Sequence, residues 1–563
     1  MIKNKENLRV FALGGLNEVG KNCYVLEKKN DIIIIDAGIK FLNSNYNLAN
    51  AIIPNFEYIK KNKDKVKAIF ISHGHEDHIG AMPYLLEILP NVPVYGSDFS
   101  LAILKQKMRN GFKLISSSFS DDTVISTSEF KVSFFRVTHS IPGSFGLIVE
   151  VIEDESRIIL TGDFKFDWTE IGEKTDIAKL AECGRKGVDL LLSDSTNSEV
   201  KGTTPSEIKV INRLENLIFQ SPGRVIITSF ASNVYRLKKV IEIAKKYNKR
   251  IALLGSSLSK MMEAIKKASL WKIDSSVFID VESIKTFPKE KLIIFCTGSQ
   301  GEERAVLSRL ANQTYSDLKI IEGDSIILTS SPIMDNRYNL EIINNKLYEL
   351  GATIYENNKE DLLHASGHAS QEDLKLMLTL VNPKHFMPFH GDYRMLKTHG
   401  FLAEEIGIPK KNIFICENGE VVSSQKNKDG NNSFFVKNEK IFTKPDYIFN
   451  QKVISGEIWD SSVELRKEMY EAGVIIILIF ISKKGKNKFV NFPHIFTYGF
   501  INIQKNKDLI RKWKEEILLM LNKLENYDEK NMKKEITSSI KEIFKRDWKG
   551  KEPVILPIIE RES

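Results

Sequence analysis

Cysteine is scarce in this sequence. The chain has 563 residues and four cysteines, Cys23, Cys183, Cys296 and Cys416, which are far apart and form no CxxC pair. This distribution argues against a disulfide framework, because disulfide-stabilised domains carry closely spaced cysteines. We expect all four to be small buried hydrophobic side chains in a protein of the reducing cytoplasm.

Long hydrophobic runs are also lacking. The longest, residues 474–481, has the length of a strand and is too short to span a membrane. The first seven residues are charged and polar and lack the hydrophobic segment of a signal peptide. The sequence therefore predicts a cytoplasmic protein without a membrane span.

Histidine is uncommon as well, but it is unevenly distributed. Three of the ten histidines, His73, His75 and His78, lie within six positions, together with Asp77. Residues 66–71 before them have the pattern of a buried strand, and a helix pattern begins after them. Imidazole and carboxylate groups are metal ligands, and a polar loop with incidental histidines would not cluster them so densely.

Further residues that can bind metal stand at the ends of other predicted strands. His139, Asp163 and His390 each follow an apolar, β-branched run. A single histidine or aspartate at a strand end is usually a cap or a satisfied polar group. The recurrence favours a metal site, and Asp36, which ends a fourth strand, then becomes a hydrogen-bond partner of a metal ligand.

These side chains suffice for two divalent ions. We expect two ligand sets joined by one carboxylate: His73, His75 and His139 for one ion, Asp77, His78 and His390 for the other, and Asp163 as the bridge. The ligand types favour zinc, with manganese or magnesium as alternatives. Two adjacent ions hold a hydroxide and clamp the attacked and leaving oxygens, so the predicted reaction is hydrolysis of a phosphodiester, an amide or an ester.

Beyond the histidine loop, the chain shows several kinds of organisation. Alternating helix and strand patterns from about residue 206 predict a doubly wound α/β insert. Its small-residue turns at 230–233 and 297–301 suit phosphate, although ordinary helix capping explains either turn equally well. Residues 364–368 form a second histidine-containing turn before a helix. The segment 423–432 is rich in Lys, Asn, Gly and Ser and predicts a linker.

Taken together, the motifs resemble those of a known family. HxHxDH with Asp36, His139, Asp163 and His390 is the pattern of the metallo-β-lactamase fold, and the insert resembles a β-CASP domain. More closely, the chain is similar to bacterial ribonuclease J from about residue 8 to residue 559. The segments that carry this similarity are 11–15, 138–142, 161–167, 192–197, 296–302 and 389–394.

The resemblance implies a fold and its division into domains. The fold is α/β: an αββα metallo-β-lactamase sandwich with an inserted, doubly wound β-CASP domain and a small C-terminal α/β domain. The expected boundaries are 1–206 and 357–422 for the two parts of the sandwich, 207–356 for the β-CASP domain, 423–450 for a linker and 451–563 for the C-terminal domain.

The resemblance also implies an activity. Such an enzyme degrades 5′-monophosphorylated RNA from its 5′ end, has some endonuclease activity, and acts in mRNA decay and rRNA maturation as a homodimer or homotetramer or with a paralogous subunit. By position, the RNA 5′ end or backbone would contact Ala231, Ser232 and Asn233, and the scissile phosphate would contact His364, Ala365, Ser366, Gly367 and His368. His368 would orient the phosphate or protonate the leaving oxygen, with Asp194 beside it and Asp77 at the metal.

Some positions depart from the family pattern. Ala365 stands where Thr is frequent, Gly143 stands where an acidic residue is common, and residues 255–257 lack a frequent Arg. These departures bear on substrate grip and oligomer contacts rather than on the metal ligands. The alternatives are another hydrolase on the same fold and a non-catalytic RNA-binding scaffold of a decay complex. The complete ligand set argues against the scaffold, and the net charge of +8 is a minor argument for a nucleic-acid partner.

Overall fold

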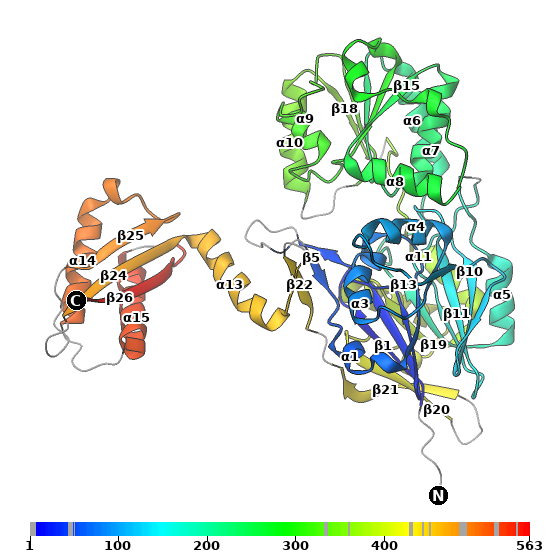
Figure 1. The fold of residues 1–563 in the computed structure, drawn as a ribbon, viewed down its shortest axis with the longest axis horizontal. Coiled ribbons are helices and arrows are strands. Elements are labelled where there is room, and N and C mark those ends of the chain that lie inside the picture. The colour runs from blue at the N-terminus through cyan, green and yellow to red at the C-terminus, as the bar shows by residue number, and fades with distance from the viewer. Residues whose placement is uncertain are drawn as a thin grey trace, which may run out of the picture. The chain divides into compact units, whose positions relative to one another are not determined.

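Figure 1 shows the fold of the chain in a computed structural model. The residues that the structure describes are 7–42, 49, 51–169, 171–331, 336–358, 361–426, 432–441, 444–449, 452–482, 492–522, 529–547 and 550–562. They form two compact units, of which the first comprises residues 1–41 and 51–446 and the second comprises residues 42–50 and 447–563. None of the described helices is long and apolar enough to cross a membrane.

The first unit contains an eight-stranded sheet built largely from the N-terminal part of the chain. Its strands are β1 (Arg9–Gly14), β2 (Cys23–Lys28), β3 (Asp31–Ile35), β6 (Val66–Phe70), β7 (Val94–Gly96), β8 (Ser116–Ser118), β20 (Glu420–Lys426) and β21 (Asn432–Lys440). Their order is β21-β20-β1-β2-β3-β6-β7-β8. Pairing is antiparallel from β21 to β3 and parallel from β3 to β8.

A second sheet of six strands faces the first. Its strands are β9 (Val124–Ser126), β10 (Phe130–Arg136), β11 (Phe145–Val151), β12 (Arg157–Leu160), β13 (Val188–Asp194) and β19 (Pro383–Phe389), in the order β19-β13-β12-β11-β10-β9. The strands β12, β13 and β19 are parallel to one another. Because β10 is antiparallel to β11, and β11 to β12, β10 also ends at the same edge of the sheet as these three.

The two sheets bury their facing sides in one core. Phe70 of the first sheet and Phe134 of the second are both fully buried there, with ring centroids 6.0 Å apart. Each such side chain contributes roughly 1.5–3 kcal/mol through burial. Helices follow the strands as α1 (Glu57–Lys61), α2 (Glu76–Ile79), α3 (Met82–Ile88) and α4 (Asp98–Lys107) in the first half and as α5 (Ile177–Lys186), α11 (Gln371–Val381) and α12 (Tyr393–Glu405) in the second.

The helices cover the outer faces of the two sheets. Leu180 of α5, Leu378 of α11 and Leu402 of α12 pack with strand residues such as Phe386 in a separate apolar cluster. In the first sheet, α3 and α4 lie in crossovers between parallel strands, and the inner face is already filled by the second sheet, so these helices lie outside. This arrangement is the expected αββα sandwich.

The insert between β13 and α11 is a doubly wound domain, green in Figure 1. Its strands are β14 (Val225–Thr228), β15 (Arg250–Leu254), β16 (Leu292–Cys296), β17 (Ser325–Leu328) and β18 (Thr353–Glu356), all parallel in the order β15-β16-β14-β17-β18. Its α-helices are α6 (Glu207–Gln220), α7 (Val234–Lys246), α8 (Ser256–Lys267), α9 (Val306–Ala311) and α10 (Arg337–Glu349). The central strands β14, β16 and β17 are mostly apolar and fully buried, because helices cover both faces of the sheet, and this explains the continuous hydrophobic runs of the sequence.

The segment expected as a linker, 423–450, is largely β structure in its described residues. Residues 423–426 end β20, and β21 pairs with it in an antiparallel hairpin, with Val422 and Phe434 buried in the sandwich core. Further along, β22 (Asp446–Phe449) pairs with β23 (Lys452–Ile454). The Lys, Asn and Gly that indicated a linker fall mainly on residues 427–431, which lie outside the described residues.

The second unit has a small α/β core. It contains α13 (Gly456–Ala472), β24 (Val474–Ser482), β25 (His494–Tyr498), α14 (Lys507–Leu521), α15 (Glu529–Asp547) and β26 (Val554–Glu562), with the strand order β25-β24-β26. The alternate residues Ile475, Ile477 and Ile479 of β24 pack under the two last helices. Trp513 of α14 is fully buried, and its ring lies edge-on to Phe544 with centroids 4.2 Å apart.

Candidate metal centre

The candidate ligands lie where strand ends of the two sheets meet. Asp163 follows β12, His390 follows β19 and His139 lies just beyond β10, all at one edge of the second sheet. In the first sheet, His73 and His75 follow β6 and lead into α2. The sequence places these residues at strand ends, and the face-to-face packing of the sheets brings the ends together.

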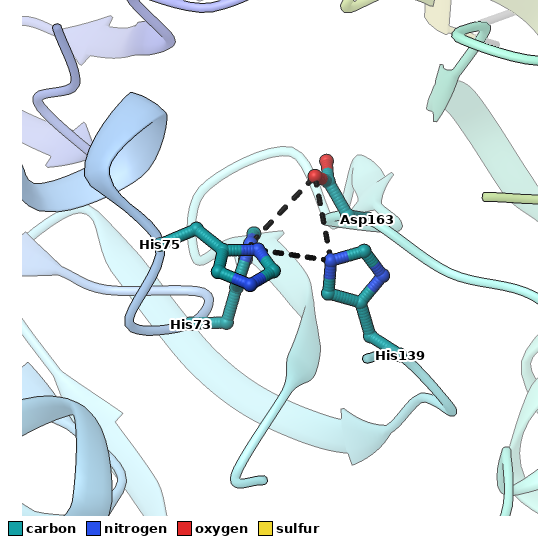
Figure 2. Close-up of side chains that lie close together, drawn as sticks. All are labelled: His73, His75, His139 and Asp163. Atoms are coloured by element: carbon teal, nitrogen blue, oxygen red, sulfur yellow. Dashed lines mark hydrogen bonds and ion pairs between the residues drawn. The ribbon is translucent and has the colours of Figure 1, made fainter. Parts of the chain in front are cut away.

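The first group consists of His73, His75, His139 and Asp163, drawn in Figure 2. His75 Nδ1 lies 3.1 Å from His73 Nε2 and 3.1 Å from His139 Nε2. Asp163 Oδ2 lies 3.6 Å from His73 Nε2 and 3.9 Å from His139 Nε2. Four donor atoms that all lie within 4.8 Å of one another can surround a single cation.

Hydrogen bonds behind these rings turn their lone pairs towards the centre. His139 Nδ1 donates to the Gly367 carbonyl at 2.8 Å, which leaves Nε2 unprotonated. The Ser72 hydroxyl donates to Asp36 and lies 3.0 Å from His73 Nδ1, which can therefore donate to it. Such partners fix the tautomer and the orientation of ligating histidines. The donor set therefore fits a metal.

The second group consists of Asp77, His78, Asp163 and His390. His78 Nε2 lies 3.2 Å from Asp163 Oδ2 and 3.6 Å from Asp77 Oδ2. His390 Nε2 is 3.3 Å from Asp77 Oδ2 and is buried without a hydrogen-bond partner in the part of the chain that the structure describes. Asp163 belongs to both groups, as its predicted bridging role requires.

Asp36 holds the second group in place. Its carboxylate accepts hydrogen bonds from His78 Nδ1 at 2.8 Å, from the Ser72 amide at 2.8 Å and from the Ser72 hydroxyl at 2.7 Å. Asp36 and His390 both have a left-handed backbone, with φ of 62° and 53°. Non-glycine residues adopt this conformation at a cost, and it is often retained where function requires a particular side-chain direction.

The two groups differ in their electrostatics. Burial lowers the pKa of His75 to about 4 and the pKa values of His73 and His139 well below the usual range. Burial acts in the same direction on His390, but Asp163 and Asp77 outweigh it and raise the pKa of His390 to about 10. The first three imidazoles are therefore neutral.

The same balance applies to His78 and to the carboxylates. Despite burial, Asp163, Asp77 and Asp36 raise the pKa of His78 well above its usual value. In return, His390 and His78 hold the pKa of Asp163 well below its ordinary range, against the effect of burial. The second group thus consists of carboxylates neutralised by imidazolium protons, and a bound cation would replace those protons.

His368 forms a third group with Asp194, Asp163 and His390. Its Nδ1 donates to Asp194 Oδ2 at 2.7 Å, across 174 positions of sequence. Burial alone would lower the pKa of His368, but Asp194 and Asp163 raise it above the usual value. Asp194 is held by the amide and hydroxyl of Thr196 at 3.0 and 2.8 Å. The His368 ring is therefore held in a fixed orientation beside the candidate metal ligands.

The residues expected to contact RNA are only partly brought together. Asn233, Ala365 and Ser366 line, with His139, a cavity of about 20 Å³, which has room for one water molecule. Ala231 and Ser232 precede α7, which Asn233 caps through its side chain, and they do not line this cavity.

The remaining two residues of the second histidine turn play different parts. His364 Nδ1 is buried without a hydrogen-bond partner in the described residues, and burial with the nearby Arg236 charge lowers its pKa to about 4. It belongs to none of the three groups. At Gly367, an added Cβ would lie 2.6 Å from His139 Cε1, so only glycine allows this close approach.

Sequence reasoning did not identify Asn22. This residue is fully buried, its Nδ2 lies 3.0 Å from His78 Nε2, and Tyr24 donates to its Oδ1 at 2.7 Å. Its signal in the sequence was a polar residue at the start of an apolar strand, which also fits an ordinary turn.

Comparison with family models covers most of the chain. Residues 16–192 match the metallo-beta-lactamase superfamily and residues 222–347 match the beta-CASP domain of ribonuclease J. Residues 357–416 match the RNA specificity domain of Zn-dependent metallo-hydrolases, and residues 461–562 match the ribonuclease J C-terminal domain. The succession agrees with the fold expected from the sequence.

Whole-chain relatives decide the family. The chain is 36% identical to ribonuclease J2 of Bacillus subtilis (strain 168), with 99% of each chain covered. It is also 36% identical to ribonuclease J 1 of Streptococcus pyogenes serotype M3, covering 98% of this chain and 97% of the relative. The chain belongs to the ribonuclease J family. Among solved structures, an Enterococcus faecalis V583 protein of unknown function shares the fold, with a TM-score of 0.55 at 19% identity over 74% of this chain and all of that one.

Membership of the ribonuclease J family confirms the predicted family and the predicted metallo-β-lactamase, β-CASP and C-terminal domains. The family is one of nucleases, and the fold implies the use of divalent metal, for which the groups described above are candidate sites.

Proposed function

We propose that this chain is a zinc-dependent ribonuclease that hydrolyses RNA phosphodiester bonds. It removes nucleotides from the 5′ end of 5′-monophosphorylated RNA, cuts internally as a second activity, and acts in cytoplasmic mRNA decay and rRNA maturation. The observation that carries the proposal is the convergence of two ligand groups on Asp163 in a member of a ribonuclease family. Manganese or magnesium remain alternatives to zinc.

Two ions per subunit account for the donor set. His73, His75 and His139 would hold one, Asp77, His78 and His390 the other, and Asp163 both. When bound, such ions supply Lewis acidity and lower the pKa of water. Asp77 has the additional role of facing the reacting phosphate, since its side chain is about one-third exposed whereas Asp163 is buried.

His368 supplies the proton in this proposal. A water oxygen bonds to phosphorus and loses one proton to the solvent, the bond from phosphorus to O3′ breaks, and a proton passes from His368 Nε2 to the leaving O3′. His368 then regains a proton from the solvent. Asp194 supports this role because it binds Nδ1 at 2.7 Å, so the acidic N–H faces away from the carboxylate. General acid catalysis of this kind contributes ~10²–10⁴-fold. The alternative role of the same ring is to orient the phosphate.

The RNA 5′ end would lie against the β-CASP turn and the second histidine turn. Ala231, Ser232 and Asn233 contribute from the first, and His364, Ala365, Ser366 and Gly367 contribute from the second. The cavity shared by Asn233, Ala365 and Ser366 beside His139 supports this assignment. We further propose the domain boundaries expected from the sequence, apart from the linker, and a homodimer or homotetramer, with a paralogous subunit as the alternative partner.

A nuclease assay tests the proposal. The purified protein receives uniformly labelled RNA with a 5′ monophosphate, and the same labelled RNA with a 5′ hydroxyl, each with and without a chelator. Labelled mononucleotides should accumulate from the first RNA only, and re-added zinc should restore activity after chelation. RNA binding without any cleavage would support the non-catalytic scaffold instead. Cleavage that survives chelation would contradict the metal assignment.

A further inference from the structure

Thr204 lies where the chain crosses from the sandwich into the β-CASP domain, two residues before the cap of α6. It is buried, and its hydroxyl donates to the His368 carbonyl at 2.7 Å. The same hydroxyl accepts the Ser370 amide at 2.9 Å, and the Thr204 amide donates to Asp373 Oδ2 at 2.9 Å. One side chain thus connects the domain crossover to the turn that carries His368.

The carbonyl of His368 has two donors. Besides Thr204, Asn197 Nδ2 donates to it at 3.1 Å. The imidazole of the same residue is held separately by Asp194 at 2.7 Å. Backbone and ring are therefore fixed by three groups from residues 194–204. Loss of one carbonyl donor removes one of these three hydrogen bonds, so the His368 carbonyl is held less firmly.

The residues after Thr204 are tied to the loop that carries Asp163. The Ser206 hydroxyl donates to Asp167 Oδ1 at 2.7 Å, and the Glu207 amide donates to Asp167 Oδ2 at 3.0 Å. The first turn of α6 is therefore anchored four residues from Asp163. The crossover contacts both the proton donor and the loop of the bridging carboxylate.

We propose that Thr204 is a positioning residue: its hydroxyl fixes the His368 backbone so that the ring can deliver its proton to the leaving oxygen. This inference rests on the proposed role of His368. It also predicts that the β-CASP domain, through its entry segment, helps set the geometry of proton transfer.

The test compares Thr204→Val, which keeps the shape of the side chain and removes the hydroxyl, with Thr204→Ser, which restores the hydroxyl. Two substrates are used: 5′-monophosphorylated RNA and a nucleoside 5′-(p-nitrophenyl phosphate), whose weakly basic leaving group needs no proton. We expect Thr204→Val to lower kcat on RNA about tenfold, with KM unchanged, and to leave kcat on the aryl ester nearly unchanged. Thr204→Ser should recover most of the loss.

Two further variants guard the interpretation. Asn197→Leu removes the other donor to the His368 carbonyl and should give the same substrate pattern, so the inference stays testable if Thr204→Val does not fold. Thr127→Val, which removes a hydroxyl that accepts the Phe130 amide at 3.0 Å in a hairpin turn, should lower stability without changing either kcat. Metal content should match the wild type in every variant.

The outcomes separate the inference from the proposed function. Two results would overturn the positioning role alone. The first is an equal loss of kcat on both substrates. The second is an unchanged kcat on RNA in Thr204→Val and Asn197→Leu while His368→Ala loses activity on RNA. If His368→Ala itself keeps full activity on RNA, the proton-donor assignment fails and the inference fails with it. A loss of kcat on RNA, without a loss on the aryl ester, in Thr204→Val, Asn197→Leu and His368→Ala supports both the positioning role of Thr204 and the proton-donor role of His368.

Discussion

The two ligand groups should release different numbers of protons when ions bind. In the metal-free protein, the pKa of His390 is raised to about 10 and the pKa of His78 is raised well above its usual value. Both rings are then imidazolium at neutral pH. A cation needs the lone pair at each Nε2, so binding at the second group must displace about two protons.

The first group should release close to none. The pKa of His75 is lowered to about 4, and the pKa values of His73 and His139 are lowered well below the usual range, so all three rings are already neutral. Two displaced protons make the affinity of the second group rise about 100-fold per pH unit between pH ~6.5 and ~8, or about 2.7 kcal/mol. The affinity of the first group should be nearly constant over that range.

Calorimetry measures this difference directly. Chelator-treated protein is titrated with zinc in several buffers of equal pH but different ionisation enthalpy, and the slope of the observed heat gives the protons released in each binding step. His390→Ala should remove about one proton from the second step and none from the first. Equal release in both steps, or a second-step affinity that does not vary with pH, would refute the assignment of charges to the two groups.

Three other predictions concern ligands and stability. His75→Ala should lower nuclease activity by more than ~100-fold and largely keep RNA affinity, because contacts to backbone phosphates dominate RNA binding. The control is His494→Ala, which changes an exposed histidine. Full activity in His75→Ala would contradict the two-ion assignment. Neighbouring hydroxyl groups outweigh burial and lower the pKa of Asp167 to about 2, so its stabilisation is present above pH ~4 and is lost as the pH falls towards 2. Asp167→Asn should make the free energy of unfolding, measured with urea, less dependent on pH in that window. An unchanged pH dependence would count against the stabilising role of Asp167. Glu207→Gln leaves the buried Arg236 without its anionic partner and should lower the free energy of unfolding by ~3 kcal/mol or more. Replacing Glu207 with Leu and Arg236 with Met together should recover most of that loss. A near-neutral Glu207→Gln variant would show that the pair is not buried in solution.

Much of the candidate centre could be predicted from residue type and position. The loop with His73, His75 and His78 and the strand-end residues His139 and Asp163 have metal-ligand chemistry, and apolar strand patterns precede them. Strand periodicity is a local property, so a single sequence reveals it. The doubly wound insert was predictable for the same reason. The expected linker was wrong for its described residues, which pair in β structure, because a short stretch rich in Lys, Asn, Gly and Ser does not exclude strands beside it.

By itself, then, the sequence determined which side chains stand at strand ends and what chemistry they carry. Only the tertiary structure decided which of those ends meet. The hydrogen bond from His368 to Asp194 joins residues 174 positions apart, and the hydrogen bond from Thr204 to the His368 carbonyl joins residues 164 positions apart. Asn22 likewise reaches His78 across 56 positions. Such contacts follow from the packing of two sheets and a crossover, which no local periodicity encodes.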